Sequence, residues 1–307
     1  MFSTPRRPRV RSRMLRAVTA AACAALVPVA LAGCGSSGSG DAGSAGTASA
    51  GADGGLKLVN PGKLTVCTHM AYKPFQFNKD GKIVGFDVDI VDLAAKEMGL
   101  EQQIIDIEFQ QIWSGAAFKA KKCDIGAAGM TITDARKKSV AFSEPYFDAT
   151  QALLVKKGSS VKDLAALRGK KLGVQTETTG QEYATKNASA NGYEVVVFDD
   201  LPLEVNAVKS GRVDAAINDN GVLFDFAKDN PDTEVVAEFD TGEHYGISAA
   251  KDDANATAIL GKVNTAIANA KKDGAYNEIY KKWFGTTPQP ASPAASSAAT
   301  PNASPSS

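Results

Sequence analysis

The sequence predicts an α/β fold in which helices cover both faces of mostly parallel β-sheets. Short runs of β-branched residues alternate with helical patterns over most of the chain, and 44% of the residues are hydrophobic, which is enough to bury a core. Such alternation favours parallel sheets, because two parallel strands need a long crossover that is usually a helix. The length of 307 residues fits two ordinary domains.

The expected strands are short apolar runs. In chain order they cover residues 64–66, 124–128, 171–174, 194–198 and 213–217. Ligands of parallel sheets bind at the carboxyl ends of the strands, beside the N-termini of helices. The residues that follow these runs are therefore the first candidates for a site.

The expected helices have apolar residues at a spacing of three and four. They cover residues 87–98, a segment near 203–209, a pattern around 259–267, and 275–283. In the first, Ile90, Val91 and Ala94 share one face and Gly99 ends the helix. Gly285 ends the last helix in the same way.

The first 33 residues have the order of a secretory signal. Six arginines within residues 1–16 precede an apolar run at 17–32, which is shorter than the roughly 20 residues a spanning helix needs. The run ends in Leu-Ala-Gly-Cys, which resembles a bacterial lipobox. That resemblance implies cleavage before Cys34 and a lipid on Cys34. An ordinary signal with an incidental cysteine is the alternative.

Low-complexity segments flank the region that can pack a core. Residues 34–55 are almost entirely Gly, Ser, Ala and Thr and predict a flexible tether, and residues 286–307 predict a disordered tail rich in Pro, Ala and Ser. The folded body is expected at 56–285.

The overall charge balance excludes general nucleic-acid binding. The chain has 34 basic and 34 acidic residues, and removal of the six arginines of the signal leaves 28 basic against 34 acidic groups, a net of about −6. An acidic body has no general electrostatic attraction for a phosphate backbone.

Two cysteines belong to the body. In an exported protein Cys67 and Cys123 can form a disulfide, and since both adjoin expected strands, buried free thiols are the other interpretation.

Catalytic motifs are missing from the sequence. His69 and His244 lack metal-ligand spacing, and there is no nucleophile elbow, phosphate-binding loop or paired-cysteine zinc motif. Asp87 and Asp89 flank a helix start, and we interpret them as N-terminal capping residues and not as an acid–base pair. The sequence therefore predicts neither an enzyme nor a metal or cofactor site.

A series of motifs in fixed order marks the body. They are Tyr72-Lys73-Pro74-Phe75, Gly85-Phe86-Asp87-Val88-Asp89, Ala128-Gly129-Met130-Thr131-Ile132-Thr133 with Arg136, Phe142-Ser143-Glu144-Pro145-Tyr146, Gly173-Val174 through Thr178-Thr179, Gly211-Arg212-Val213-Asp214-Ala215, Tyr245-Gly246-Ile247 and Tyr280-Lys281-Lys282-Trp283-Phe284-Gly285. With these motifs the body resembles the polar amino-acid family of solute-binding proteins that serve ABC importers (family 3).

The resemblance implies a two-lobed periplasmic-binding-protein-like fold of type II. Two crossover strands form the hinge, and each lobe holds a mostly parallel sheet with flanking helices. Lobe one would comprise residues 56–152 and 246–285, and lobe two residues 153–245.

Two charged residues match positions that bind the charged groups of a free amino acid. Arg136 resembles the family's carboxylate clamp, and Asp219, after the expected strand 213–217, matches its ammonium acceptor. Both ligand charges need partners when water is expelled, and a guanidinium can hold both carboxylate oxygens. The alternatives are a helix-surface arginine paired with Asp134 and an aspartate in a surface turn.

Small and hydroxylated residues match the rest of the head-group site. Thr131 resembles a position that holds the ligand head, and Gly129 would let the backbone approach. Thr178 and Thr179 open an expected helix and could add an anion site at its N-terminus. A simple turn and a simple N-cap are the alternatives.

Aromatic residues match the walls around the ligand side chain. Tyr72 resembles the first wall, with a core aromatic as the alternative, and the second wall is assigned to Phe109, with Trp113 in competition. His69 stands where many family members have an aspartate. Since an imidazole removes a fixed negative charge, His69 favours glutamine or glutamate over arginine and lysine, unless it only packs near the hinge.

The resemblance implies a substrate-binding lipoprotein, exported and anchored to the outer face of the bacterial cytoplasmic membrane. It would bind a free amino acid by closure of the lobes, as a monomer without a cofactor, and deliver it to a membrane permease driven by a separate ATPase. A ligand sensor for a membrane receptor and a dehydratase of cyclic amino-acid precursors are the alternatives from other classes.

Overall fold

The structure is a computed structural model that describes residues 55–288. The expected signal at 1–33, the lipidation at Cys34, all of the tether except Gly55, and the tail from residue 289 onward lie outside the described residues. Nothing below depends on them.

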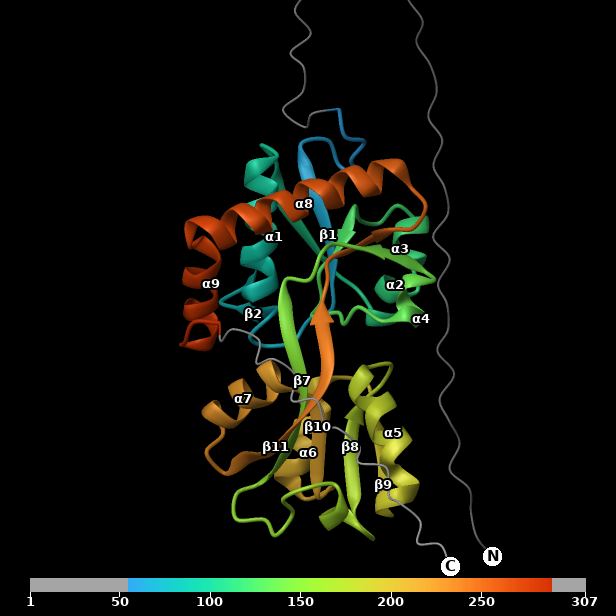
Figure 1. Ribbon diagram of the computed structural model, residues 1–307, viewed down its shortest axis with the longest axis vertical. Helices are drawn as coiled ribbons and strands as arrows, with labels where there is room; N and C mark the ends of the chain where they lie inside the picture. The colour runs from blue at the N-terminus through green and yellow to red at the C-terminus, as the bar shows by residue number, and fades with distance from the viewer. Residues whose placement is uncertain (1–54, 289–307) are drawn as a thin grey trace, which may run out of the picture. The chain divides into compact units, whose positions relative to one another are not determined.

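The first of two five-stranded sheets lies in lobe one, with the strand order β4-β1-β5-β12-β6 (Figure 1). Its strands are β1 (Lys63–Thr68), β4 (Glu101–Asp106), β5 (Ile125–Gly126), β6 (Val140–Phe142) and β12 (Ser248–Ala250). Strands β4, β1 and β5 are parallel, whereas β12 pairs antiparallel with both β5 and β6. A short hairpin of β2 (Phe77–Lys79) and β3 (Lys82–Val84) projects beside this sheet.

The second sheet lies in lobe two, with the order β11-β7-β10-β8-β9. Its strands are β7 (Phe147–Lys156), β8 (Lys171–Gln175), β9 (Glu194–Phe198), β10 (Ala215–Asp219) and β11 (Thr233–Tyr245). Again three adjacent strands, β10, β8 and β9, are parallel and the other pairs are antiparallel. The five strands expected from the sequence are confirmed, and parallel β4 and the antiparallel strands add to them. Each sheet therefore combines two parallel and two antiparallel strand pairs.

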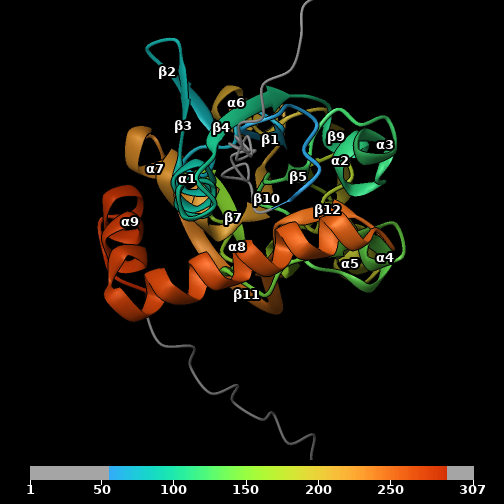
Figure 2. The same ribbon diagram turned by 90° about the horizontal axis from the view of Figure 1, so that it is seen from above.

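Helices flank both sheets. Lobe one has α1 (Phe86–Glu97), α2 (Phe109–Trp113), α3 (Ala116–Lys119), α4 (Asp134–Lys137), α8 (Ala254–Asp273) and α9 (Ala275–Phe284), and lobe two has a 3-10 turn (Ala165–Leu167), α5 (Thr179–Asn191), α6 (Leu201–Ser210) and α7 (Asn220–Asp229). Figure 2 shows α8 crossing lobe one beside α1, with which it is in contact. No helix within 55–288 combines the length and the apolar character needed to cross a membrane.

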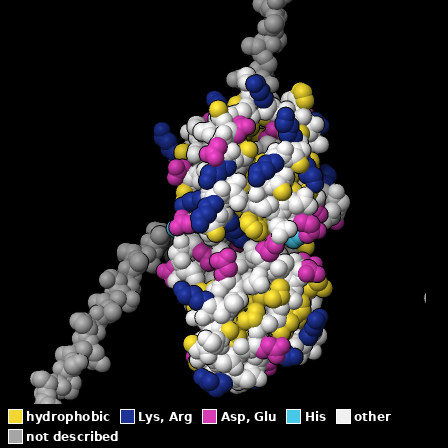
Figure 3. Space-filling view, turned by 90° about the vertical axis from the view of Figure 1, so that its right-hand side faces the viewer, with side chains coloured by type: hydrophobic (Ala, Val, Ile, Leu, Met, Phe, Trp, Pro, Cys, Tyr) yellow, Lys and Arg dark blue, Asp and Glu magenta, His cyan; other side chains and the backbone are white. Residues whose placement is uncertain are grey.

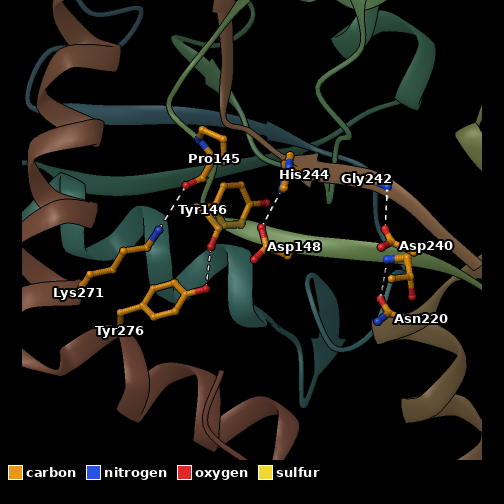
Figure 4. Close-up of polar contacts among 10 residues, drawn as sticks. Pro145, Tyr146, Asp148, Asn220, Asp240, Gly242, His244, Lys271 and Tyr276 are labelled. Atoms are coloured by element: carbon orange, nitrogen blue, oxygen red, sulfur yellow. Dashed lines mark hydrogen bonds and ion pairs between the residues drawn. The ribbon is translucent and has the colours of Figure 1, made fainter. Parts of the chain in front are cut away.

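The two long strands β7 and β11 run between the lobes (Figure 1). They pair from Lys156 and Thr233 to Phe147 and Tyr245, and β7 crosses the expected boundary at residues 152/153 without a break. The lobe boundaries therefore stay predictions. His244 Nδ1 lies 2.7 Å from Asp148 Oδ1 across this pair (Figure 4).

Helices α8 and α9 fix the segment that leads into β7. The Tyr276 hydroxyl donates to the Tyr146 carbonyl oxygen at 2.7 Å, and Lys271 Nζ donates to that of Pro145 at 3.3 Å (Figure 4). The hinge strand is thus anchored to lobe one at its first residues.

Aromatic rings fill the space behind the hinge. We call this group the hinge aromatic cluster; it comprises Phe75, Phe86, Phe147, Tyr245, Tyr280 and Phe284. Phe75 lies 4.9 Å from Phe147 and 5.2 Å from Tyr245 between ring centroids, within the range of favourable aromatic pairs. A Cβ on Gly221, in α7, would come within 2.9 Å of the Phe75 ring, so α7 also packs tightly on the cluster.

The capping interpretation of Asp87 and Asp89 is wrong. Neither side chain caps α1, because the N–H groups of Phe86 and Asp87 already donate to the carbonyl oxygens of Pro74 and Phe75. Asp87 is buried and accepts from the Gly129 N–H at 2.7 Å and the Tyr146 hydroxyl at 2.6 Å. Asp89 accepts from two side chains of α9, each at 2.6 Å, Lys282 and Trp283.

Cys67 and Cys123 are joined as a disulfide within lobe one, with their Cα atoms 5.6 Å apart. Both residues are buried, Cys67 in β1 and Cys123 just before β5. The disulfide links β1 to the segment that leads into its parallel neighbour β5.

Candidate functional site

A narrow cavity lies between the two lobes. It is lined by His69, Tyr72, Gln76, Phe109, Ala128, Gly129, Thr131, Arg136, Gln175, Thr178, Thr179 and Asp219. Every residue that the sequence analysis assigned to ligand binding is among them, although these residues are up to 150 positions apart. Gln76, Ala128 and Gln175 were not predicted.

The ends of strands bring these residues together. Thr68, Gly126, Gln175 and Asp219 end four strands, and the lining residues lie at or shortly after these positions. A site at the carboxyl ends of parallel strands is what this sheet topology favours. Asp219 is itself the last residue of β10, not the residue after it, because pairing with Gln151 of β7 extends the strand.

Arg136 is buried in the cavity wall, with 6% of its surface exposed. Its Nη1 donates to the Thr131 carbonyl oxygen at 3.0 Å, its Nη2 donates to that of Glu177 at 3.1 Å, and its guanidinium lies over the Phe109 ring at 5.1 Å. The pairing with Asp134 does not occur; Asp134 lies near Lys137 instead. Burial lowers the pKa of Arg136, opposed chiefly by the charge of Asp219, and a guanidinium stays protonated in either case.

Asp219 is the buried carboxylate of the opposite lobe. It accepts from the Tyr72 hydroxyl at 2.9 Å, from Gln151 Nε2 at 2.5 Å, and from the Tyr245 hydroxyl. Burial, followed by the like charge of Glu243, raises the pKa of Asp219 to about 6. The surface-turn alternative is wrong, since only 5% of the residue is exposed.

Gly129 has a positive φ of 55°, and a Cβ at this position would lie 2.8 Å from the Tyr72 ring. Its N–H donates to Asp87, whose pKa burial raises to about 7. Glycine is therefore required by conformation and by space, but its N–H is already bonded and is not free for a ligand.

The hydroxyls at the start of α5 have different roles. Thr178 is the N-cap: its Oγ1 accepts from the Gln181 N–H at 3.1 Å and donates to the Gln175 carbonyl oxygen at 2.8 Å. Thr179 points across the cleft, with its Oγ1 3.5 Å from that of Thr131 in lobe one. The two lobes thus meet at a pair of hydroxyls.

Glu243 is the residue that the sequence analysis missed. It lies in β11, and its Oε2 accepts from Thr179 Oγ1 at 2.8 Å and from Thr131 Oγ1 at 3.1 Å. Both its oxygens also lie within 3.3 Å of Gln151 Nε2. No motif marked this glutamate. The alternation along β11 did offer a signal, since Glu238 and Asp240 take exposed positions and Glu243 falls in the less exposed set.

Phe109, and not Trp113, lines the cavity. Trp113 turns toward lobe two, where its Nε1 donates to Glu177 Oε2 at 3.2 Å. The Phe109 ring lies 6.4 Å from the His69 ring between centroids. His69 Nδ1 lies 3.1 Å from the Ile107 carbonyl oxygen, which can only accept, so a neutral His69 carries its proton on Nδ1 and keeps Nε2 as an acceptor.

Contacts between the lobes lie at both edges of the cleft. At the α5 edge Glu177, with a φ of 61°, accepts from Gln110 Nε2 at 2.8 Å and from Trp113. At the α7 edge Lys73 Nζ lies 3.2 Å from Asp225 and 2.5 Å from Asp229. Acidic side chains are visible along the level where the lobes meet (Figure 3).

Some acceptors of the cleft have no partner within residues 55–288. They are Gln76 Oε1, which belongs to a cavity-lining residue, and Gln151 Oε1 beside Asp219. A buried acceptor without a donor is costly, so a ligand with an N–H group would find an acceptor in Gln76, whereas Gln151 does not line the cavity. No three His, Cys, Asp or Glu residues of the described part could hold a metal ion together.

Comparison with known proteins identifies relatives of the whole body. Residues 64–286 match the family model of "Bacterial extracellular solute-binding proteins, family 3". A probable histidine-binding protein of Neisseria gonorrhoeae is 34% identical over 76% of this chain and 88% of its own length. The ABC transporter glutamine-binding protein GlnH of Bacillus subtilis is 37% identical over 68% of this chain and 75% of its own.

Among solved structures, an ancestral arginine-binding protein bound to arginine is 42% identical, with a TM-score of 0.68. The match covers 73% of this chain and 99% of that protein. These relatives are named as binding proteins and differ in the amino acid they bind.

Proposed function

Because this chain belongs to the family 3 bacterial extracellular solute-binding proteins, we propose that it captures a free polar amino acid between its lobes and delivers it to an ABC permease. The observation that carries the proposal is the pairing of buried opposite charges across the cavity. Arg136 comes from α4 of lobe one and Asp219 from β10 of lobe two.

The two charges fit the head group of an amino acid. Arg136 would bind the carboxylate through the N–H groups of its planar fork, at roughly 1.5–3 kcal/mol for each charged hydrogen bond. Asp219 would accept the ammonium group, which would relieve the unfavourable burial of its charge. His69, Tyr72, Phe109, Gly129, Thr131, Thr178 and Thr179 would enclose the remainder of the ligand.

Closure follows from the placement of the charges on different lobes. An open form can bind the ligand with one lobe only, whereas the closed form offers both partners. The ligand therefore raises the closed population by its additional affinity for that form. The hinge is provided by β7 and β11.

Of the polar amino acids we favour glutamine or glutamate. His69 provides no fixed negative charge at this end of the cavity, and with Nδ1 bonded to the Ile107 carbonyl it offers Nε2 as an acceptor. Gln76 Oε1 is a second acceptor without a partner among residues 55–288. A side-chain amide can donate to both, and an arginine or lysine would lack a carboxylate partner there.

We further propose that a lipid on Cys34 anchors the exported protein to the outer face of the cytoplasmic membrane, where a monomer serves a permease and its ATPase. Cys34→Ala should release the protein from membranes and abolish lipid labelling; unchanged attachment and labelling contradict the anchor. Gene deletion should abolish uptake, whereas intact uptake with a lost response would indicate a ligand sensor.

The test of binding is calorimetry with the twenty amino acids on the wild type and on Arg136→Ala. Loss of the carboxylate clamp should weaken binding by at least about 100-fold without unfolding the protein. Arg212→Ala is the matched control, because its guanidinium lies over the Phe198 ring in lobe two, away from the cavity. Binding by Arg136→Ala within threefold of the wild type contradicts the clamp, and product formed from a cyclic amino-acid precursor would indicate a dehydratase.

A further inference from the structure

Glu243 places a second carboxylate behind the cavity wall, in addition to Asp219, which lines the cavity. We propose that Glu243 is a specificity-determining residue, which favours amino acids with a neutral or cationic side chain over those with an acidic one. The inference rests on the proposed function and narrows its substrate class: between the two favoured ligands, it selects glutamine over glutamate.

The position of Glu243 is fixed by both lobes and by the hinge. It lies in the hinge strand β11, two residues before Tyr245, and its Oε2 accepts from Thr131 of lobe one and Thr179 of lobe two. Thr241 donates to Oε1 at 2.9 Å. The carboxylate therefore lies directly behind two residues that line the cavity.

These contacts determine whether the hydroxyls of Thr131 and Thr179 can donate a hydrogen bond to a ligand or only accept one. A threonine hydroxyl has one proton, and an ionised carboxylate can only accept. With their protons donated to Glu243, Thr131 and Thr179 can offer only lone pairs to a ligand. The hydroxyl of Thr179 therefore does not add a donor to the anion site expected at the start of α5.

The charges of the cavity point in the same direction. Arg136 is the only Lys or Arg among the lining residues, and it faces the carboxylates of both Asp219 and Glu243. Gln151 bridges these two carboxylates through its Nε2. A zwitterionic head group takes Arg136 and Asp219 as partners, which leaves the charge of Glu243 unbalanced.

An acidic ligand side chain would add to this excess. At an effective dielectric constant near 20, one extra like charge within roughly 5–10 Å changes a binding constant by about tenfold to a few hundredfold. A neutral amide avoids this repulsion, and a cation reverses it.

The experiment measures binding of glutamine and glutamate to the wild type and to Glu243→Gln by calorimetry. We expect the wild type to prefer glutamine at least about tenfold, and the variant to reduce that preference about tenfold. Arginine and its neutral isostere citrulline form a second pair, in which the variant should lower the preference for arginine.

Two further variants separate charge from structure. Glu243→Asp keeps the charge and should keep the preference. Glu238→Gln is the matched control, because Glu238 lies on the same strand and accepts from Thr150 and Asn220 outside the cavity, so the preference should not change.

The outcomes distinguish the two proposals. Intact amino-acid binding with the same preference in the wild type and Glu243→Gln overturns the role of Glu243 alone, as does a wild type that prefers glutamate. A wild type that binds no amino acid overturns the proposed function itself.

Discussion

Tyr245 belongs to two regions of this molecule that are built in opposite ways. Its ring packs in the hinge aromatic cluster, 5.2 Å from the rings of Phe75 and Phe147. Its hydroxyl donates to Asp219 in what we call the cleft network, which comprises Tyr72, Thr131, Gln151, Thr179, Asp219 and Glu243.

The hinge aromatic cluster is complete without a ligand, and the cleft network is not. The rings satisfy one another by contact, whereas the network holds the carboxylates of Asp219 and Glu243, whose hydrogen bonds within residues 55–288 come from neutral groups. Burial and electrostatic repulsion make such a network costly in the free protein. The comparison indicates that the hinge aromatic cluster contributes mainly to stability and the cleft network mainly to ligand affinity.

Removal of a ring from the hinge aromatic cluster should have the largest effect on stability. Phe86 is fully buried and contacts six other aromatic rings, so Phe86→Ala should lower the free energy of unfolding by about 3–5 kcal/mol. Urea unfolding measures this loss. Leu203→Ala, at an exposed position, should cost less than about 0.5 kcal/mol.

The same variant also tests whether the hinge aromatic cluster contributes to stability without contributing to ligand affinity. At a temperature where Phe86→Ala is folded, its ligand affinity should lie within a few-fold of the wild type. An affinity loss of more than tenfold in a protein of normal stability would show that the cluster belongs to the binding site.

Acid should act on the cleft network before it acts on the cluster. Burial and the charge of Glu243 raise the pKa of free Asp219 to about 6, and binding of an ammonium group requires the ionised form. Below pH 6 the ligand must displace a proton, so Kd should rise toward tenfold for each pH unit, about 1.4 kcal/mol. Above pH 6 this dependence should vanish.

Calorimetry between pH 4.5 and 8 measures this dependence. Asp219→Asn should bind the ligand weakly at every pH, and its Kd should not rise below pH 6. Because Asp87 has a pKa of about 7 and bonds to Gly129, Asp87→Asn is the second control and should keep the rise below pH 6. A constant Kd from pH 7.5 to 5 would refute the role given to Asp219.

Contacts at the edge of the cleft should contribute least to ligand affinity. Trp113→Phe removes one hydrogen bond to Glu177 that forms only between the lobes, so affinity should fall about two- to tenfold. Trp283→Phe is the matched control, since its Nε1 donates to Asp89 within lobe one, and its affinity should stay unchanged. Equal effects of both variants would mean that the contact of Trp113 has no part in closure.

Much of the fold could be predicted because its signals are local. The apolar spacing of α1 and the glycines that end α1 and α9 depend on residues within a few turns of one another. The capping of α1 could not be predicted, because its donors bond to carbonyl groups of the loop at Pro74 and Phe75. The packing of this loop on the start of α1 also buries Asp87.

The residues of the candidate site could be predicted as members of one set but not in their contacts. The sequence assigned the second aromatic wall to Phe109 with Trp113 in competition, and only the packing of the lobes shows that Trp113 turns toward Glu177. Glu243 was missed because no motif marks it, although it is out of phase with the exposed acids Glu238 and Asp240 of the same strand.

The sequence by itself determined the α/β class, five of the strands, four of the helices and nine of the residues that line the cleft, because these follow from local periodicity and from short motifs. Only the tertiary structure showed which side chains form hydrogen bonds with the carboxylates of the cleft network. Tyr72 reaches Asp219 and Thr131 reaches Glu243 over more than 100 residues of chain. Such contacts depend on how the two lobes close on each other, and no local pattern encodes that distance.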